Sequence, residues 1–291
     1  LSLVFMGGPS KVIVERVQTS DNISDALERL KNKRWYYLAV PGLGDGEADT
    51  VVEYIKEQRT QYHKTFKAVL PLAAADNEGI INFATDNIKI AAKTYTTAEF
   101  CCRIAGILAG LPLNRSATYY TLPEVESITE SETPDDDVDN GKLILINDGT
   151  KIKIARGVNS LTTTTEDKGD DFKKIKIIEA VDMIRDDIRA TFEDEFVGKV
   201  ENSYDNKIVF IAAVNKYFKD LANRGVLYDK YDNKAEIDID ETREWLSKTR
   251  DVSSWDDEKI KTANTGTNVF VRASIQIQDA IEDLKFGIYI E

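Results

Sequence analysis

The segment WYYLAVPGLGDGEADTVVEYIKEQRTQYHKTFKAVLP, residues 35–71, places one helical run between two short apolar runs. The outer runs, WYYLAV and FKAVLP, are rich in aromatic and apolar residues, as strands are. The central ADTVVEYIKEQRTQY has the spacing of an amphipathic helix. A strand, a helix and a strand in this order predict a mostly parallel sheet whose two faces are covered by helices.

The same alternation continues on both sides of this segment. We expect KVIVERV, 11–17, to be a strand and NISDALERLKNK, 22–33, to be a helix. Further along the chain, EGIINF and NIKI are β-like runs, and a helix is predicted from Thr97 to Leu111, where Pro112 stops it. Residues 1–120 are therefore predicted to form an α/β domain with a mostly parallel sheet.

The second half of the chain has a different organisation. TLPEVESITESETPDDDVDNG, 121–141, is acidic and lacks apolar periodicity, so we expect a surface connector. KLILINDGTKIKIA follows and predicts a hairpin that turns at Asp148-Gly149. Two amphipathic helices come next, and a short strand-like run, KAEIDID, and a helix, ETREWLSKTR, follow them. The apolar positions of the first helix are Ile177, Val181, Ile184, Ile188 and Phe192, and those of the second are Tyr204, Ile208, Ile211, Val214, Phe218 and Leu221. Residues 142–291 are predicted to be an α+β domain.

The chain ends with NVFVRASIQIQDAIEDLKFGIYIE, 268–291, which alternates apolar and polar residues. One predicted strand precedes the acidic break DAIED, and a second, with Leu284, Phe286, Ile288 and Ile290 on one face, follows it. The second strand could close the sheet of its own domain. It could instead pair with another chain, because an exposed apolar strand edge is a template for strand addition.

Composition excludes several classes of protein. The 51 acidic and 38 basic residues among 291 give a net charge of −13, which argues against binding to phosphate backbones. Cys101 and Cys102 lie in an apolar helical run and are expected to be inert thiols in a reducing compartment. No apolar run is long enough to span a membrane, and the opening residues lack the basic flank of a signal peptide. Because the chain begins with Leu1 in an apolar run, we expect an N-terminal portion to be missing.

The motif search predicts no catalytic, cofactor-binding or metal-binding residue. GLGDGEAD, Gly42–Asp49, lacks both the third glycine of a dinucleotide loop and the Gly-Lys-Ser/Thr of a phosphate loop. DDDVDNG, Asp135–Gly141, departs from a calcium loop at Asn140 and Ile146. His63 has no nucleophile motif near it. The alternative is a monomeric α/β enzyme or nucleotide-binding protein, which would carry a polar cleft near Gly42–Glu47.

Longer strings resemble the tail sheath proteins of contractile phage tails, especially the short sheaths of Gram-positive prophages and phage-tail-like bacteriocins. The resemblance spans Lys11 to Glu291 and is most diagnostic from Leu143 to Lys207. Sheaths of type VI secretion systems and other injection machines share this fold and mechanism. The strings are KTFKAVLP, EGIINFAT, RIAGILAGLPLNRSATYY, LILINDGTKIKIARGVNSLTT, DFKKIKIIEAVDMIRDDIRATFEDEFVGKVENSYDNK and VFVRASIQIQDAIEDLKFGIYI.

The resemblance implies a structural subunit without enzymatic activity or cofactor. Stacked rings of such subunits surround an inner tail tube, join baseplate and tail-end proteins, and contract to drive the tube through a target envelope. It implies assembly in the bacterial cytoplasm and a final location in the tail, with no nucleic-acid partner and no membrane insertion. It also makes Leu284–Ile290 an exchanged strand, with Asp279, Glu282 and Asp283 as its hinge. Such sheaths carry an N-terminal arm ahead of the region where this chain begins.

Overall fold

The computed structural model describes residues 1–17, 22–44, 46–166 and 168–290. The chain forms two compact units, one of residues 1–181 with 280–291 and one of residues 182–279. The first unit contains α1 (Ser2–Phe5), α2 (Ile23–Leu30), β1 (Tyr37–Ala39), α3 (Glu47–Thr60), β2 (Lys67–Pro71), β3 (Ile80–Phe83), β4 (Asp86–Ile90), β5 (Lys93–Tyr95), α4 (Thr97–Gly110), β6 (Ser127–Thr129), α5 (Pro134–Asp139), β7 (Lys142–Leu143), β8 (Leu145–Asn147), β9 (Ile152–Ile154), a 3-10 turn at Asp170–Lys173 and the start of α6 (Ile175–Glu195).

The central sheet of the first unit has the order β1-β2-β3-β7, and every neighbouring pair is parallel. Val69 of β2 lies opposite Ile81 of β3, and Phe83 lies opposite Leu143 of β7. The predicted strand, helix and strand of residues 35–71 are therefore β1, α3 and β2. The parallel sheet expected from the alternation of strands and helices is confirmed.

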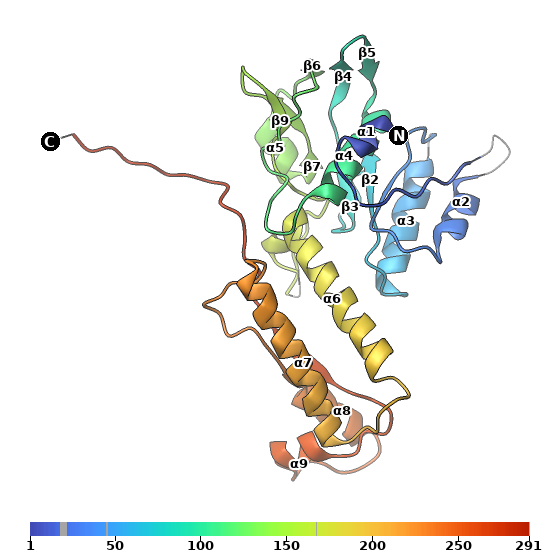
Figure 1. Ribbon diagram of the computed structural model, residues 1–291, viewed down its shortest axis with the longest axis vertical. Helices are drawn as coiled ribbons and strands as arrows, with labels where there is room; N and C mark the ends of the chain where they lie inside the picture. Colours follow the sequence, from blue (N-terminus) through green and yellow to red (C-terminus); the bar gives the residue numbers. More distant parts are fainter. Residues whose placement is uncertain (18–21, 45, 167, 291) are drawn as a thin grey trace. The chain divides into compact units, whose positions relative to one another are not determined.

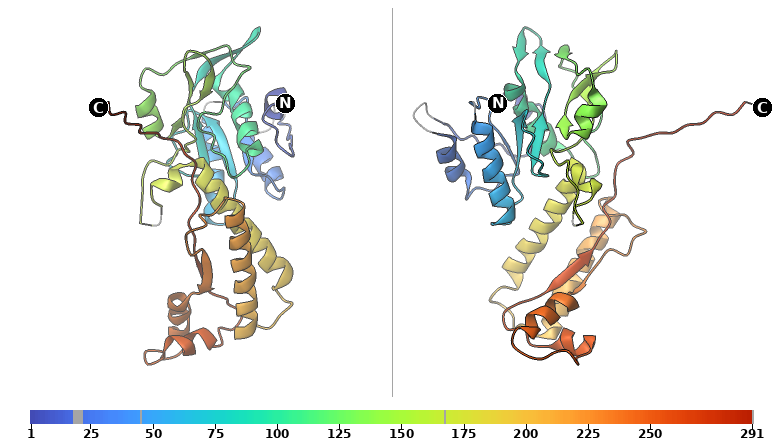
Figure 2. Two further views of the ribbon diagram at one scale, coloured as in Figure 1. Left: turned by 60° about the vertical axis from the view of Figure 1, so that its left-hand side comes forward. Right: turned by 180° about the vertical axis from the view of Figure 1, so that it is seen from behind.

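Helices cover both faces of this sheet, as Figures 1 and 2 show. Because side chains alternate along a strand, Ala68 and Leu70 face a core shared with α2 and α3. Val69 faces the opposite way, into a larger core with Phe100 and Ile104 of α4. The result is a three-layer α/β/α arrangement in which β2 and β3 are almost completely buried.

Two smaller sheets extend the first unit. β4 lies between β5 and β6 and is antiparallel to both. β8 and β9 form the predicted hairpin, in which Gly149 has the left-handed backbone (φ 89°) that the tight turn requires. The first two residues of the predicted hairpin, Lys142 and Leu143, join the central sheet instead.

A buried lysine links the central sheet to the start of α6. Lys67, 1% exposed, forms an ion pair with Glu179 at 3.1 Å and lies 5.2 Å from the ring centroid of Tyr37. The Tyr37 hydroxyl also donates a hydrogen bond to Glu179. A charge this deeply buried requires such a partner.

The second unit contains the rest of α6, then α7 (Tyr204–Asn223), β10 (Lys234–Ile237), α8 (Ile239–Ser247), α9 (Asp257–Thr262) and β11 (Val271–Ser274). Phe192 and Phe196 pack edge-on against Phe210 of α7, each with a centroid distance of 5.1 Å. Phe210, not the predicted Ile208, is therefore in the buried face; Ile208 is 40% exposed. A small core of Leu246, Val252 and Ile260 joins α8 to α9.

The structure corrects the expected strand at KVIVERV. Residues 11–17 form no strand, and Val14 is 63% exposed. Glu15 lies between Arg29 and Lys33, at 2.6 and 2.9 Å, so this segment is held by ion pairs at the surface. The alternation of apolar residues was not enough to form a strand, because the backbone groups of a strand also need a neighbouring strand with which to pair.

The expected division into 1–120, 121–141 and 142–291 differs from the two compact units of the structure. The acidic segment contains β6 and α5, and its Leu122 and Val125 are buried in the larger core. Hairpin residues Leu145 and Ile152 are buried in the same core. These few apolar side chains attach the segment to the first unit despite its acidic composition.

Glycines allow α1 to approach α4 closely. A Cβ on Gly106 would lie 2.3 Å from the Val4 carbonyl oxygen, and one on Gly110 would lie 2.0 Å from the Gly7 carbonyl oxygen. These separations are too short for any side chain. The contact buries Leu3, which is 9% exposed.

We expect Gly106→Ala to destabilise the first unit, although alanine in a helix interior normally stabilises by about 1 kcal/mol relative to glycine. The new methyl group would displace α1 and expose Leu3, whose burial contributes about 2 kcal/mol. Thermal unfolding and hydrogen exchange of residues 1–8 measure both effects. Ala109→Gly, at an exposed position of α4, is the control for helix propensity. An unchanged exchange rate for residues 1–8 would contradict the prediction.

Candidate functional site

The C-terminal segment, Leu284–Ile290, is an apolar chain that faces solvent. Figure 1 shows it as an extended trace, and it belongs to no helix or strand. Within the described part of the chain, its residues take part in no hydrogen bond or ion pair. The four predicted face residues are exposed to 84% for Leu284, 78% for Phe286, 75% for Ile288 and 94% for Ile290. Its apolar face and its backbone groups are both unpartnered.

The two alternating runs of the C-terminus have different environments. Val271–Ser274 of the first run form β11, which pairs antiparallel with β10, and Ile277 forms a bridge to Leu227. The first predicted strand thus closes a sheet in the second unit. The second run pairs with no strand among the residues that the structure describes.

Arg156 anchors the base of the C-terminal segment. Its Nη1 lies 3.1 Å from Glu282 Oε2, and its Nη2 is paired with Asp283. These hydrogen bonds, that of Asp283 first, hold the pKa of Arg156 above its usual range. Glu282 is well covered, at 17% side-chain exposure, whereas Asp283 is 79% exposed. The structure brings these two predicted hinge residues together on one guanidinium.

The third predicted hinge residue, Asp279, lies outside this ion-paired group. It is half-buried and is the last residue of the second unit. Sequence reasoning missed Arg156, which is 126 residues away from Glu282. The two adjacent acidic residues indicate that a positively charged side chain lies nearby, but only the fold identifies it as Arg156.

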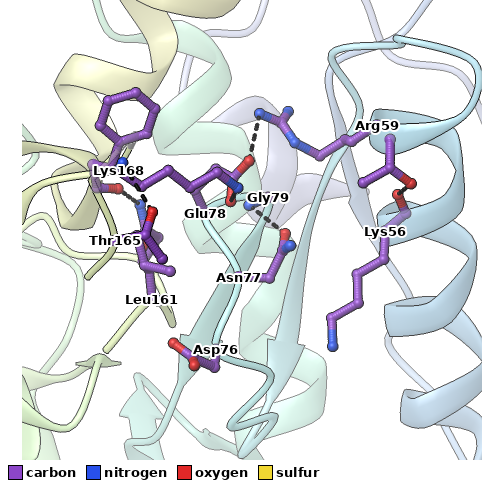
Figure 3. A network of polar contacts seen from close by, with 12 residues as sticks. Lys56, Arg59, Asp76, Asn77, Glu78, Gly79, Leu161, Thr165 and Lys168 are labelled. Carbon is purple, nitrogen blue, oxygen red and sulfur yellow. Dashed lines mark hydrogen bonds and ion pairs between the residues drawn. The ribbon is translucent and has the colours of Figure 1, made fainter. Parts of the chain in front are cut away.

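A polar cluster lies beside the central sheet, around Glu78. Figure 3 shows Glu78 between Arg59 and Lys168, with oxygen–nitrogen distances of 3.6 and 3.0 Å. Burial alone would raise the pKa of Glu78. Hydrogen bonds from its backbone N–H and from Lys168, with the nearby charge of Arg59, outweigh burial and lower the pKa. Each of these charged groups forms an ion pair with an opposite charge, so the cluster has the arrangement of a structural contact.

Neighbouring residues of this cluster also form hydrogen bonds with backbone groups. Asp76 has a left-handed backbone (φ 47°) and accepts hydrogen bonds from the N–H groups of Thr162 and Thr163 at 2.7 and 2.9 Å. The Ser160 hydroxyl donates to the Asn77 carbonyl at 2.9 Å. The cluster therefore fastens the chain after β9 to the loop between β2 and β3.

The other sequence motifs have local roles. Glu47 accepts a hydrogen bond from the Gly44 N–H at 2.5 Å, so a carboxylate already lies at the start of α3, where a phosphate would bind; Asp45 of this loop lies outside the described residues. Asp137 of α5 pairs with Lys142 at 2.6 Å. His63 is exposed. Burial raises the pKa of the Cys101 thiol above its usual range.

Two features are absent from the described residues, which leave out 18–21, 45, 167 and 291. No group of three or more His, Cys, Asp or Glu side chains is arranged to hold a metal ion. No helix in this part of the chain is both long and apolar enough to cross a membrane.

Family comparisons identify both halves of the chain. Residues 17–160 match the phage tail sheath protein central domain, and residues 167–291 match the phage tail sheath C-terminal domain. The tail sheath protein of Clostridium phage phiCD119 is 38% identical over 283 residues, which cover 96% of this chain and 79% of that protein. The class is thus that of structural proteins of contractile tails, and this chain belongs to the phage tail sheath protein family.

Solved structures share the fold. The crystal structure of a sheath tail protein from Desulfitobacterium hafniense matches with a TM-score of 0.68 and 22% identity, covering 74% of this chain and 53% of that protein. This chain thus spans about half the length of that relative. The contracted helical sheath of the anti-feeding prophage matches with a TM-score of 0.65 and 12% identity, covering 95% of this chain and 76% of that one. The comparisons support a structural sheath role over the alternative of an enzyme.

We expect Arg156→Ala to loosen the base of the C-terminal segment without unfolding the first unit. Partly exposed ion pairs contribute about 0.2–1 kcal/mol each, so the loss of two should accelerate proteolysis between residues 279 and 290 by about two- to thirtyfold. Lys285→Ala is the control, because it also removes a positive charge close to the segment's base. Equal cleavage rates in the parent chain and Arg156→Ala would show that the anchor has no effect.

We expect acid to release the contact between Asp76 and residues 162–163. The N–H groups of Thr163 and Thr162 hold the Asp76 pKa well below its ordinary value of 3.8. A depressed pKa means that the contact is fully stabilising above that value and weakens as the pH falls below it. NMR hydrogen exchange of the two amides between pH 2 and 5, corrected for intrinsic rates, measures this. Asp76→Asn, which keeps an acceptor but cannot titrate, should show no such dependence, and an equal dependence would contradict the mechanism.

Proposed function

We propose that this chain is the repeating subunit of a contractile tail sheath that encloses an inner tail tube. The observation that supports this role most directly is the exposed C-terminal segment Leu284–Ile290, in a chain that belongs to the tail sheath family. A monomer gains nothing from keeping such a segment in water. A subunit that donates it to a neighbour satisfies its backbone and buries its apolar face.

The donated segment supplies both affinity and alignment. Its backbone N–H and C=O groups would pair with a strand of the neighbouring subunit, which gives a connection that depends little on the shapes of the two domains. The four face residues would each contribute about 2 kcal/mol on burial. Because a shift by one residue would turn this apolar face to solvent, the same side chains set the register.

Contraction follows if the same subunits can pack in two lattices. In the extended sheath the subunits hold a metastable arrangement around the tube, and a signal from the baseplate releases it. The contracted lattice forms more favourable contacts between subunits, so no nucleotide hydrolysis is needed. Exchanged strands keep neighbours linked while the packed surfaces change. The proposed partners are other copies of this chain, the tube protein, and baseplate and tail-end proteins, with assembly in the bacterial cytoplasm before incorporation into the tail.

We expect Phe286→Asp combined with Ile288→Asp to prevent assembly, because two carboxylates on the apolar face cannot be buried without partners. Sedimentation velocity and negative-stain microscopy of the purified protein measure assembly. Lys285→Asp, which also introduces a carboxylate but on the opposite face, is the matched control. Assembly of the double variant into the same rings or tubes would refute the proposed role of the segment, provided that circular dichroism shows both proteins to be folded.

A further inference from the structure

One face of α7 is turned to solvent although its middle is apolar. Side chains three and four positions apart lie on the same side of a helix, so the exposed residues of α7 form a continuous stripe. Val209 in this stripe is 59% exposed and Ile208 is 40% exposed. An apolar stripe on a helix normally packs on another element, but no described element of the second unit covers this one. This outer face of α7 consists of Asp205, Ile208, Val209, Ala212, Ala213 and Lys216.

The two ends of the outer face carry opposite charges. Asp205 lies in the first turn of α7, and Lys216 follows it about three turns further along the helix. Among the described residues, neither side chain forms a hydrogen bond or an ion pair. Two copies of such a face are complementary only when they run in opposite directions, because parallel copies would place like charges together.

An antiparallel arrangement also matches the sizes of the apolar side chains. With a twofold axis midway between Phe210 and Ile211, each branched side chain of the outer face lies level with an alanine of the second copy. Alanines allow two helices to approach closely, and the larger side chains fill the space beside them. The level pairs are Asp205 with Lys216, Ile208 with Ala213, and Val209 with Ala212.

We propose that the outer faces of α7 from two copies of this chain pack antiparallel, so that free subunits form a twofold dimer. The occupant is a second copy because the face is complementary to itself in both charge and side-chain size. Two helix faces about three turns long bury less than the roughly 1,200 Å² of total surface that stable complexes bury. The dimer is therefore weak and reversible.

The symmetry of this dimer separates it from the contacts of a sheath. A twofold axis across the helices points the two subunits in opposite directions. Under the proposed function, all subunits point the same way along the tube, because contraction drives the tube in one direction. The dimer thus belongs to subunits that have not yet assembled, in which it covers an apolar face that would otherwise favour non-specific association.

The first test measures the dimer by sedimentation equilibrium. The full chain carries Phe286→Asp and Ile288→Asp, which are expected to block assembly through the terminal segment, and any larger assembly is first removed by pelleting. We expect a reversible equilibrium between monomer and dimer. Adding Val209→Asp should weaken the dimer at least about tenfold, because the carboxylate would be buried without a partner. Val14→Asp, at a valine that is 63% exposed in the first unit, is the matched control and should leave the dimer unchanged.

The second test reverses charges to establish the antiparallel register. Asp205→Lys and Lys216→Asp should each weaken their own dimer, because each reversal turns both attractive pairs of the dimer into repulsive ones. A mixture of the two variants restores both attractive pairs and should form a mixed dimer about as tight as that of the starting chain. Lys230→Asp makes the same change of charge at a side chain that is 73% exposed in the second unit, and it should have no effect.

A chain that stays monomeric at every concentration would overturn the proposed dimer. So would a dimer that is equally tight with Val209→Asp, provided that circular dichroism shows the variant to be folded. If that variant is not folded, the charge reversals decide, because they lie at exposed positions. Two reversed variants that show no preference for each other would overturn the antiparallel register. None of these outcomes bears on the proposed function, which is judged by whether the double aspartate variant assembles.

Discussion

Backbone N–H and C=O groups at the edge of a strand need partners, and this requirement organises the functional part of the molecule. Three parts of the chain differ in how this requirement is met. Among the described residues, the amide of Asn215 closes the edge of β10, the backbone groups of Val271, Ala273 and Ile275 make no hydrogen bond, and those of Leu284–Ile290 make none either. In an isolated protein the open groups would be a liability for aggregation. We propose that in a sheath subunit they connect one copy to the next.

The first unit provides a firm base for this connection. Its sheet is buried on both faces, and charged groups around it form ion pairs: Lys67 with Glu179, and Glu78 with Arg59 and Lys168. Removing one partner of a buried pair is costly, because it leaves an uncompensated charge, so such pairs resist local opening. Arg156 extends this base to the C-terminal segment through Glu282 and Asp283. The segment is thus held at one end, whereas Leu284–Ile290 make no hydrogen bond or ion pair with any described residue.

This combination suits an assembly whose subunits must change their packing without separating. A connection through backbone hydrogen bonds tolerates rotation of the joined domains better than a connection through two large, complementary surfaces. The net charge of −13 also suits such an assembly, because repulsion between like charges opposes non-specific association of free subunits. Specific pairing then depends on the apolar face of the segment and on which strand edges are open to it.

The sequence by itself determined the elements whose signals are local. Period-two and helical patterns located β1, β2, β3, α3, α4, α6 and α7, and the order of longer strings identified the family. The exposed face Leu284, Phe286, Ile288 and Ile290 was also readable, because alternation alone defines a face.

Only the tertiary structure decided which elements found partners. KVIVERV alternates as a strand does but pairs with no strand in the described part of the chain. The acidic segment 121–141 is held by Leu122 and Val125, and Phe210 replaces Ile208 in a helix face. The sequence could not specify Arg156 as the anchor or Asn215 as the edge cap, since each acts on residues far along the chain or on another element. The physical reason is that a sequence pattern states what a side chain or strand edge requires, whereas the fold determines what lies beside it.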